Sequence, residues 1–310
     1  MLYRSLDAPA AVLLVAGSCL VTLFWSSAGI PLESSGPQQV SAQLRDNETY
    51  RNRRFGGRGG AGFRPRPVPA RDEFPQWKNP HGFEQDAFTF VRIQYDSYGP
   101  FGWWDRWDND YPDGDWNFSY RLQQMTSLKV DPDGRVLRFS DPDLFRYPFI
   151  YLAGVQTMRL SQTERVALRR YLLNGGFMMV DDFWSARAWE NLLAEMRQVF
   201  PDREPTELSL NHPIFHQVYD LDELPQVVDF KTWSDGFAFE HAHGASDGDH
   251  APHFWAYCDD RGTVVALLCH NNDIGDGWER EAENEAYFRE FSEKRSYPLG
   301  INVVTYALTH

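Results

Sequence analysis

The sequence of 310 residues contains little cysteine, and beyond residue 71 it is short of positive charge. Cys19, Cys258 and Cys269 are too few for a disulfide framework; the last two end strand-like runs, so two core thiols are expected unless those strands are neighbours and pair them. Residues 72–310 hold 21 basic against 40 acidic side chains, whereas residues 1–71 hold nine arginines against four acids. Because phosphate contacts require a basic face, this composition argues against nucleic acid as a partner of the folded part.

Long uncharged runs are also scarce, but one such run, Ala8–Gly29, is long enough to cross a bilayer. Ser26 and Ala28 also fit a signal-peptidase site, so residues 1–29 are expected to be either a hydrophobic membrane-anchoring helix or a cleaved signal. Residues 30–84 include the Arg-, Gly- and Pro-rich stretch NRRFGGRGGAGFRPRPVPAR and predict a flexible linker. We therefore expect a single-pass inner-membrane anchor with a periplasmic domain, or a secreted protein if the signal is cleaved.

Residues 85–310 alternate between strand-like and helical patterns. A capping box, Ser161 to Glu164, opens one predicted helix, and the continuous apolar run that follows it is typical of a strand buried on both faces of a parallel sheet. The rhythm predicts a doubly wound α/β domain with a mostly parallel sheet, followed by a hairpin and two helices. The predicted strands cover residues 87–95, 135–140, 148–154 and 176–182, the hairpin 253–269, and the helices 115–128, 161–176, 186–200, 279–294 and 297–310.

Two adjacent carboxylates, Asp181 and Asp182, end the buried strand at the edge where ligands gather in such sheets. One interpretation is structural: one aspartate caps the helix that starts near Ser185, and the other accepts a backbone amide. The other interpretation is functional: the pair faces a cleft, one pKa is raised by the other carboxylate, and the site serves acid–base chemistry or holds a cation. His212, which precedes a proline, is either a third member of this candidate catalytic site or a structural histidine.

A second strand end carries Tyr95 and the loop WWDRWDNDYPDGDW, which places three tryptophans among five aspartates in Trp103–Asp115, with Trp116 beyond. Asp108 and Asp110 fit the first two ligand positions of a calcium loop, but Pro112 and Asp113 depart from that pattern. The loop either lines a ligand cleft, where tryptophans suit carbohydrate stacking, or packs over the sheet edge. The candidate ligand-binding residues beside the Asp181–Asp182 pair are Tyr95, Trp103, Trp104, Asp105, Asp108 and Asp110.

The stretch HAHGASDGDHAPH invites a zinc interpretation through His241, His243, His250 and His253. The Gly, Ala and Ser residues between them instead indicate an exposed loop without the rigid surroundings that a metal needs. We therefore expect no cofactor, with a divalent metal as the alternative.

Two further polar residues fall in otherwise apolar elements. Arg92, in the first strand, is expected either to pair with a loop aspartate or to bind an anion. Asn302, in the last helix, is expected to be buried, hydrogen-bonded and attached to the sheet.

Six segments in order resemble the domain of unknown function 4159 family over about residues 87–310. They are GWWDRWDNDYPDGDWNF, YPFIYLAG, LRRYLLNGGFMMVDDF, FPDREPTELSLNHPIFHQVYDL, RGTVVALLCHNNDIGDGWE and YPLGINVVTYALTH. The resemblance implies a bacterial envelope protein with a fold similar to the class I glutamine amidotransferase-like proteins, which is flavodoxin-like. In amidotransferases the strand equivalent to GGFMMVDD leads to a cysteine nucleophile on a tight elbow. Here Asp181 and Asp182 take that place, with no cysteine, serine or threonine before Ser185, so glutamine amidotransferase chemistry is rejected.

These observations favour a membrane-tethered module that binds a small molecule, a glycan or a protein of an envelope complex. The alternative is a hydrolase acting on an envelope substrate such as a glycan, with Asp181 and Asp182 in acid–base or metal-holding roles. The two hypotheses differ in what they require of the site. An enzyme needs Asp181, Asp182 and His212 to converge on one pocket.

Overall fold

The computed structural model describes residues 70–82, 86–98, 107–240 and 249–310. The predicted N-terminal anchor or signal, and the linker up to residue 69, lie outside these residues. In the part that is described, no helix combines the length and apolar character needed to cross a membrane.

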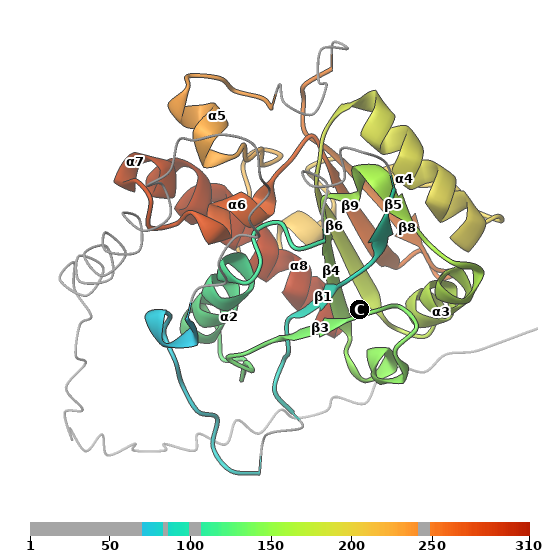
Figure 1. The fold of residues 1–310 in the computed structure, drawn as a ribbon, viewed down its shortest axis with the longest axis horizontal. Helices are drawn as coiled ribbons and strands as arrows, with labels where there is room; N and C mark the ends of the chain where they lie inside the picture. The colour runs from blue at the N-terminus through green and yellow to red at the C-terminus, as the bar shows by residue number, and fades with distance from the viewer. Residues whose placement is uncertain (1–69, 83–85, 99–106, 241–248) are drawn as a thin grey trace, which may run out of the picture.

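A mostly parallel sheet of seven strands forms the centre of the domain (Figure 1). Its first five strands in spatial order run parallel to one another, and the last two pair antiparallel at one edge. In spatial order the strands are β3 (Arg135–Leu137), β1 (Val91–Ile93), β4 (Phe149–Ala153), β6 (Phe177–Phe183), β9 (Val264–His270), β8 (His253–Cys258) and β7 (Thr206–Glu207). A separate two-stranded ribbon pairs β2 (Asp96–Ser97) with β5 (Met158–Arg159).

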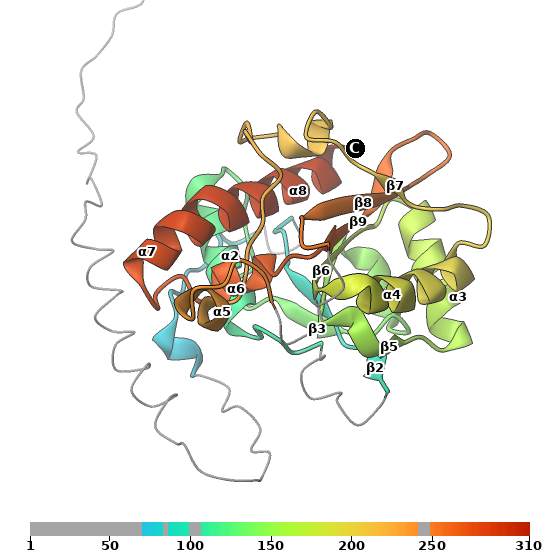
Figure 2. The same cartoon turned by 90° about the horizontal axis from the view of Figure 1, so that it is seen from above.

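Helices cover both faces of the sheet (Figures 1 and 2). One face carries α3 (Gln162–Leu173) and α4 (Ser185–Val199), and the other carries α2 (Asp113–Met125), α6 (Ile274–Glu279) and α8 (Tyr297–Thr309). Side chains of β6 alternate between the two resulting cores, because successive residues of a strand point to opposite faces. The remaining elements are α5 (Phe230–Ser234), α7 (Glu285–Tyr287), a π-helical segment (Phe288–Ser296) and 3₁₀ turns at Arg71–Glu73, Pro142–Arg146, Val155–Thr157 and Pro213–Phe215.

Several local predictions are confirmed. Ser161 caps α3, and its side chain and that of Glu164 exchange hydrogen bonds with each other's backbone amides. The strand over β6 is buried along its whole length. The hairpin of β8 and β9 turns where expected, with the Gly262 amide donating to the Asp259 carbonyl (3.1 Å). Cys258 and Cys269, which lie on these two neighbouring strands, are free thiols.

The helix expected over residues 279–294 is wrong as a single element. The chain forms α6, which starts earlier, and then α7 and the π-helical segment. Side-chain caps explain the division: Asp273 accepts the Asp276 amide at the start of α6 (3.0 Å), and Asn284 accepts the amides that open α7.

Two polar residues also differ from expectation in their partners. Asn302 is buried and hydrogen-bonded, but it ties α8 to the loop at Val218 and Tyr219 rather than to the sheet. Asp115, the first residue of the helix predicted over 115–128, lies inside the first turn of α2, and its carboxylate accepts from Arg92. The end of the predicted linker packs on the domain, where the Trp77 indole donates to the Val130 carbonyl (2.8 Å).

Candidate metal centre

Asp181 and Asp182 lie at the carboxyl end of β6, where the register with β9 shifts between Val180 and Phe183. Asp182 has a left-handed backbone (φ 53°), which is uncommon outside glycine and is consistent with a bulge that redirects its side chain. Asp181 is fully buried, and its Oδ2 accepts the Gly275 amide (2.8 Å) and the Tyr151 hydroxyl (2.9 Å). Neither aspartate caps α4, whose N-cap is Trp184 without a side-chain cap.

Asp182 is buried too, and its carboxylate accepts a hydrogen bond from a side chain of the loop before α2. Its Oδ2 accepts the amide of Asn109 (2.7 Å), which belongs to the loop before α2. The next residue of that loop, Asp110, is also left-handed (φ 60°) and buried. Left-handed non-glycine residues are costly and persist only where their surroundings hold them, so both positions are held by the packing of this edge.

Asp110 Oδ2 is buried and has no hydrogen-bond partner among the described residues. It lies so close to α6 that a Cβ on Gly275 would be 2.5 Å from it and 2.6 Å from the Tyr151 hydroxyl. Gly275 is therefore required by close approach, and the carboxylate stays pressed against the start of α6. An unpaired buried carboxylate oxygen is costly and needs an explanation, such as a bound ion.

Six buried carboxyl groups meet at this edge, and none exposes more than 7% of its surface. They form two triads, within each of which three ligand atoms lie within 4.8 Å of one another. We call them together the carboxylate cluster. The first triad is Asp182, Glu240 and Asp273, and the second is Asp110, Asp276 and Glu279.

Burial and mutual repulsion act on these acids. Burial, followed by the charges of Glu279, Asp182 and Asp276, raises the pKa of Asp110 well above its ordinary range. The pKa of Asp273 is raised well above its ordinary range in the same way, and that of Asp276 to about 7, where Arg280 opposes the burial effect. Because members of one triad act on members of the other, the two triads are neighbours.

The pKa of Asp181, which lies beside the cluster, is raised less. Burial raises its pKa to about 6, and the hydrogen bonds from Gly275 and Tyr151 oppose that shift. Arg280 contacts the second triad, with its Nε 2.6 Å from Glu279 and 3.5 Å from Asp276, and also pairs with Glu283 (3.1 Å).

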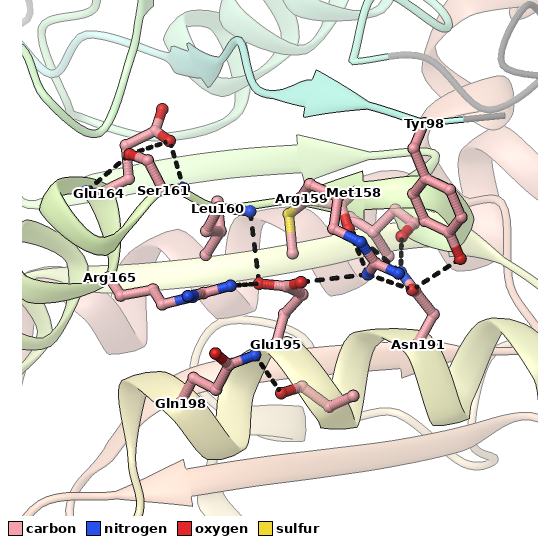
Figure 3. Close-up of polar contacts among 12 residues, drawn as sticks. Tyr98, Met158, Arg159, Leu160, Ser161, Glu164, Arg165, Asn191, Glu195 and Gln198 are labelled. Atoms are coloured by element: carbon pink, nitrogen blue, oxygen red, sulfur yellow. Dashed lines mark hydrogen bonds and ion pairs between the residues drawn. The ribbon is translucent and has the colours of Figure 1, made fainter.

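Two buried acids outside the cluster, Glu195 and Asp115, are paired with arginines. Glu195 in α4 receives Arg159 (3.1 Å), Arg165 (3.0 Å) and the Leu160 amide (3.3 Å), as Figure 3 shows. Asp115 receives the fully buried Arg92, at 2.5 Å. In the carboxylate cluster, Arg280 pairs with two of the six acids, Asp276 and Glu279. Hard oxygen ligands in such excess suit a divalent cation such as Ca²⁺, Mg²⁺ or Mn²⁺.

The structure separates His212 from the aspartate pair. Its Nδ1 accepts the Ile214 amide (3.2 Å) at the start of a 3₁₀ turn, and its ring lies 6.0 Å from that of Tyr306. Tyr306 in turn contacts Phe177, at the opposite end of β6 from the aspartates, which is about 13 to 17 Å away at roughly 3.3 Å per residue. His212 is therefore structural, and the three candidate catalytic residues do not converge.

The predicted zinc histidines that are described have other partners. His250 stacks on Phe239 (3.7 Å between ring centroids), and His253 contacts Glu207 (2.5 Å) and Asp249 (3.0 Å). His241 and His243 lie outside the described residues.

Of the other candidate ligand residues that are described, one belongs to the carboxylate cluster and two do not. The Tyr95 hydroxyl donates to the carbonyls of Ala153 and Gly154 and so joins two strand ends. Asp108 is half-buried and belongs to neither triad, whereas Asp110 joins the second. Trp103, Trp104 and Asp105 lie outside the described residues.

Four members of the cluster went unpredicted. Asp273 follows β9 just as the aspartate pair follows β6, so the rule on strand ends could have found it. Asp276 and Glu279 are three residues apart on α6 and so share a helix face. Glu240 carries no local signal, because it reaches the site from a loop.

The comparison with protein families agrees with the resemblance drawn from the motifs. The family described as Domain of unknown function (DUF4159) matches residues 89–308. No curated protein matches the sequence. The match spans the sheet and the carboxylate cluster, and the chain belongs to the DUF4159 family.

Proposed function

We propose that this domain is a ligand-binding module of the bacterial cell envelope, tethered through its N-terminal segment, and that its carboxylate cluster binds a divalent cation. The observation that carries the cation is Asp110 Oδ2, a buried carboxylate oxygen that lies beside five other buried acids and has no partner in the part of the chain that the structure describes. A cation would give that oxygen a ligand and would offset the repulsion within the cluster.

The strand order supports a doubly wound, flavodoxin-like arrangement of the kind found in amidotransferase-like proteins. The parallel strands β3, β1, β4, β6 and β9 follow the spatial order 2-1-3-4-5 when numbered along the chain. Ligands of such folds bind at the carboxyl ends of the strands, where the cluster lies. The amidotransferase nucleophile has no counterpart: Cys269 is fully buried, and burial raises its thiol pKa well above the ordinary value.

A hydrolase that uses the cation is the second candidate, favoured by the membership of Asp182 in a triad. The cation would then polarise an envelope substrate or a water molecule. An acid–base role for Asp181 has less support, because its Oδ2 is engaged by Gly275 and Tyr151 and the residue is fully buried.

Thermal denaturation of the full chain in detergent tests the proposal. After treatment with a chelator, addition of Ca²⁺, Mg²⁺ or Mn²⁺ should raise the melting temperature, because a ligand at 100 times its Kd stabilises the folded state by about 2.7 kcal/mol. Asp182→Asn should reduce the shift, since it removes a charged ligand and keeps a side chain that tolerates the left-handed backbone.

The matched control is Glu195→Gln, a buried acid outside the cluster. It should lower the melting temperature but leave the shift caused by the cation unchanged. If none of the three cations shifts the wild-type melting temperature, the cluster is a network of shared protons and the proposal is wrong.

A further inference from the structure

Arg280 brings a positive charge into the second triad of the carboxylate cluster. It follows α6 directly, so its side chain starts one residue after Glu279 and one helical turn after Asp276. Its Nε lies 2.6 Å from Glu279 and 3.5 Å from Asp276. Two of the three acids of this triad, whose third member is Asp110, are therefore already in contact with a cationic side chain.

The same side chain also has a partner outside the triad. A terminal nitrogen of Arg280 donates to the carboxylate of Glu283 at 3.1 Å. The side chains of Arg280 and Glu283 keep 15% and 11% of their surface exposed, whereas that of Glu279 keeps 1%. Arg280 thus lies between two buried acids and a third acid nearer to solvent, and a change of rotamer can move its charge from the buried pair towards Glu283.

A divalent cation and Arg280 would compete for the same carboxylates. Ca²⁺ takes oxygen ligands at roughly 2.3–2.6 Å, so a cation bound to Glu279 would lie within about 7 Å of the Arg280 Nε. Two positive charges at that distance repel each other strongly inside a protein, where salt screens them little. Removing the arginine's charge, or moving it towards Glu283, should therefore strengthen cation binding.

Arg92, a second positive charge near Asp110, does not have this freedom. Its guanidinium is fully buried and donates to Asp115 and to the carbonyls of Trp107 and Asn109. Those contacts hold it in one place. Of these two arginines, Arg280 is therefore the one whose charge can move when a cation arrives.

We infer that Arg280 is a resident counter-ion of the second triad, which pairs with Asp276 and Glu279 in the cation-free protein and moves towards Glu283 when a divalent cation binds. This inference rests on the proposed cation-binding function. A ligand in this triad is supported independently by Asp110 Oδ2, which is buried and has no hydrogen-bond partner among the described residues. Arg280 thereby sets the affinity of the site, because a cation must displace it.

Titration calorimetry of the full chain in detergent tests the inference. The protein is stripped with a chelator, and Ca²⁺, Mg²⁺ and Mn²⁺ are each titrated at pH 8, where protons compete less for the carboxylates than at lower pH. Arg280→Gln should bind the cation at least about tenfold more tightly than the wild type, because the repulsion is removed. Glu283→Gln should bind it several-fold more weakly, because Arg280 then loses its partner outside the triad.

The two variants should change the affinity in opposite directions, which a general loss of stability does not produce. Weaker or unchanged binding in Arg280→Gln would show that the arginine positions the ligands or plays no part, and would overturn the inference but leave the proposed function intact. Tighter or unchanged binding in Glu283→Gln would overturn the movement towards that residue. If neither the wild type nor either variant binds any of the three cations, the proposed function is wrong as well.

Arg165→Gln is the matched control, because it removes another mostly buried arginine, which pairs with Glu195 on the opposite face of the sheet. It should lower the melting temperature and leave the Kd unchanged; a changed Kd would mean that affinity follows stability and would overturn the inference. Arg280→Lys keeps the charge and should bind the cation about as tightly as the wild type. Binding as tight as that expected of Arg280→Gln would refute the role of the charge. If Arg280→Gln does not fold, Glu283→Gln and Arg280→Lys still decide.

Discussion

The pair of Arg92 and Asp115 predicts a large loss of stability on removal of the arginine. The guanidinium is fully buried in β1, donates to both oxygens of Asp115, and also donates to the carbonyls of Trp107 (3.0 Å) and Asn109 (2.8 Å). Arg92→Met would keep much of the stem but leave a buried carboxylate and two carbonyls without their donor. Breaking a buried pair in this way costs about 3–5 kcal/mol.

That loss is a large fraction of the total free energy of unfolding. Folded domains are stable by about 5–15 kcal/mol, so the variant should show a clearly lower urea midpoint, followed by tryptophan fluorescence. Adding Asp115→Asn removes the uncompensated charge, and the double variant should recover part of the loss. It should not recover all of it, because the carbonyls of Trp107 and Asn109 remain without the guanidinium.

The control is Arg197→Met, which removes an arginine from an exposed ion pair with Glu204. It should cost less than about 1 kcal/mol. Two results would refute the reasoning: an Arg92→Met variant that loses less than about 1 kcal/mol, or a double variant no more stable than the single one. Either result would mean that a buried Asp115 carboxylate without its arginine does not destabilise the domain as argued.

Three further predictions test other parts of the domain. Ser161→Ala should lower the free energy of unfolding by about 1 kcal/mol through loss of the α3 cap, measured by urea unfolding. Gly275→Ala should weaken Mn²⁺ binding and lower the melting temperature, because its Cβ would collide with a carboxylate and a phenol of the site. Partial burial lowers the pKa of His253, but its contacts with Glu207 and Asp249 outweigh this and raise it. Its contribution should be fully present below pH 6.5 and lost as the pH rises through the raised pKa, so the wild type should lose more stability over that range than His253→Gln.

Much of the fold could be predicted because its signals are local. The capping box at Ser161 and the continuous apolar run of β6 depend on neighbours in the chain, and both predictions are confirmed. The division of the helix predicted over 279–294 could not be foreseen, because charged helix-forming residues continue through the whole stretch. The division depends on the caps at Asp273, which precedes the stretch, and at Asn284, which lies within it.

Two members of the carboxylate cluster were predicted, Asp182 at the end of a strand and Asp110 in the loop before α2. The end of β6 pointed to Asp181 and Asp182, since the ends of parallel strands meet at one edge. Glu240 and the separation of His212 depend on the path of long loops, which residue patterns do not encode. The pairing of Arg92 with an aspartate was foreseen as one of two alternatives, because a lone buried guanidinium is too costly.

The contrast between the buried acids of one domain supports the cation more than any single distance does. Where a carboxylate is buried for structure, as at Asp115 and Glu195, the chain supplies arginine side chains at 2.5–3.1 Å. At the carboxyl edge the same chain gathers six acids, pairs Arg280 with Asp276 and Glu279, and holds Asp110 and Asp182 in left-handed backbone conformations. A cluster with only a structural role would be more stable with apolar residues in place of several acids. The proposed cation would offset the mutual repulsion of these carboxylates.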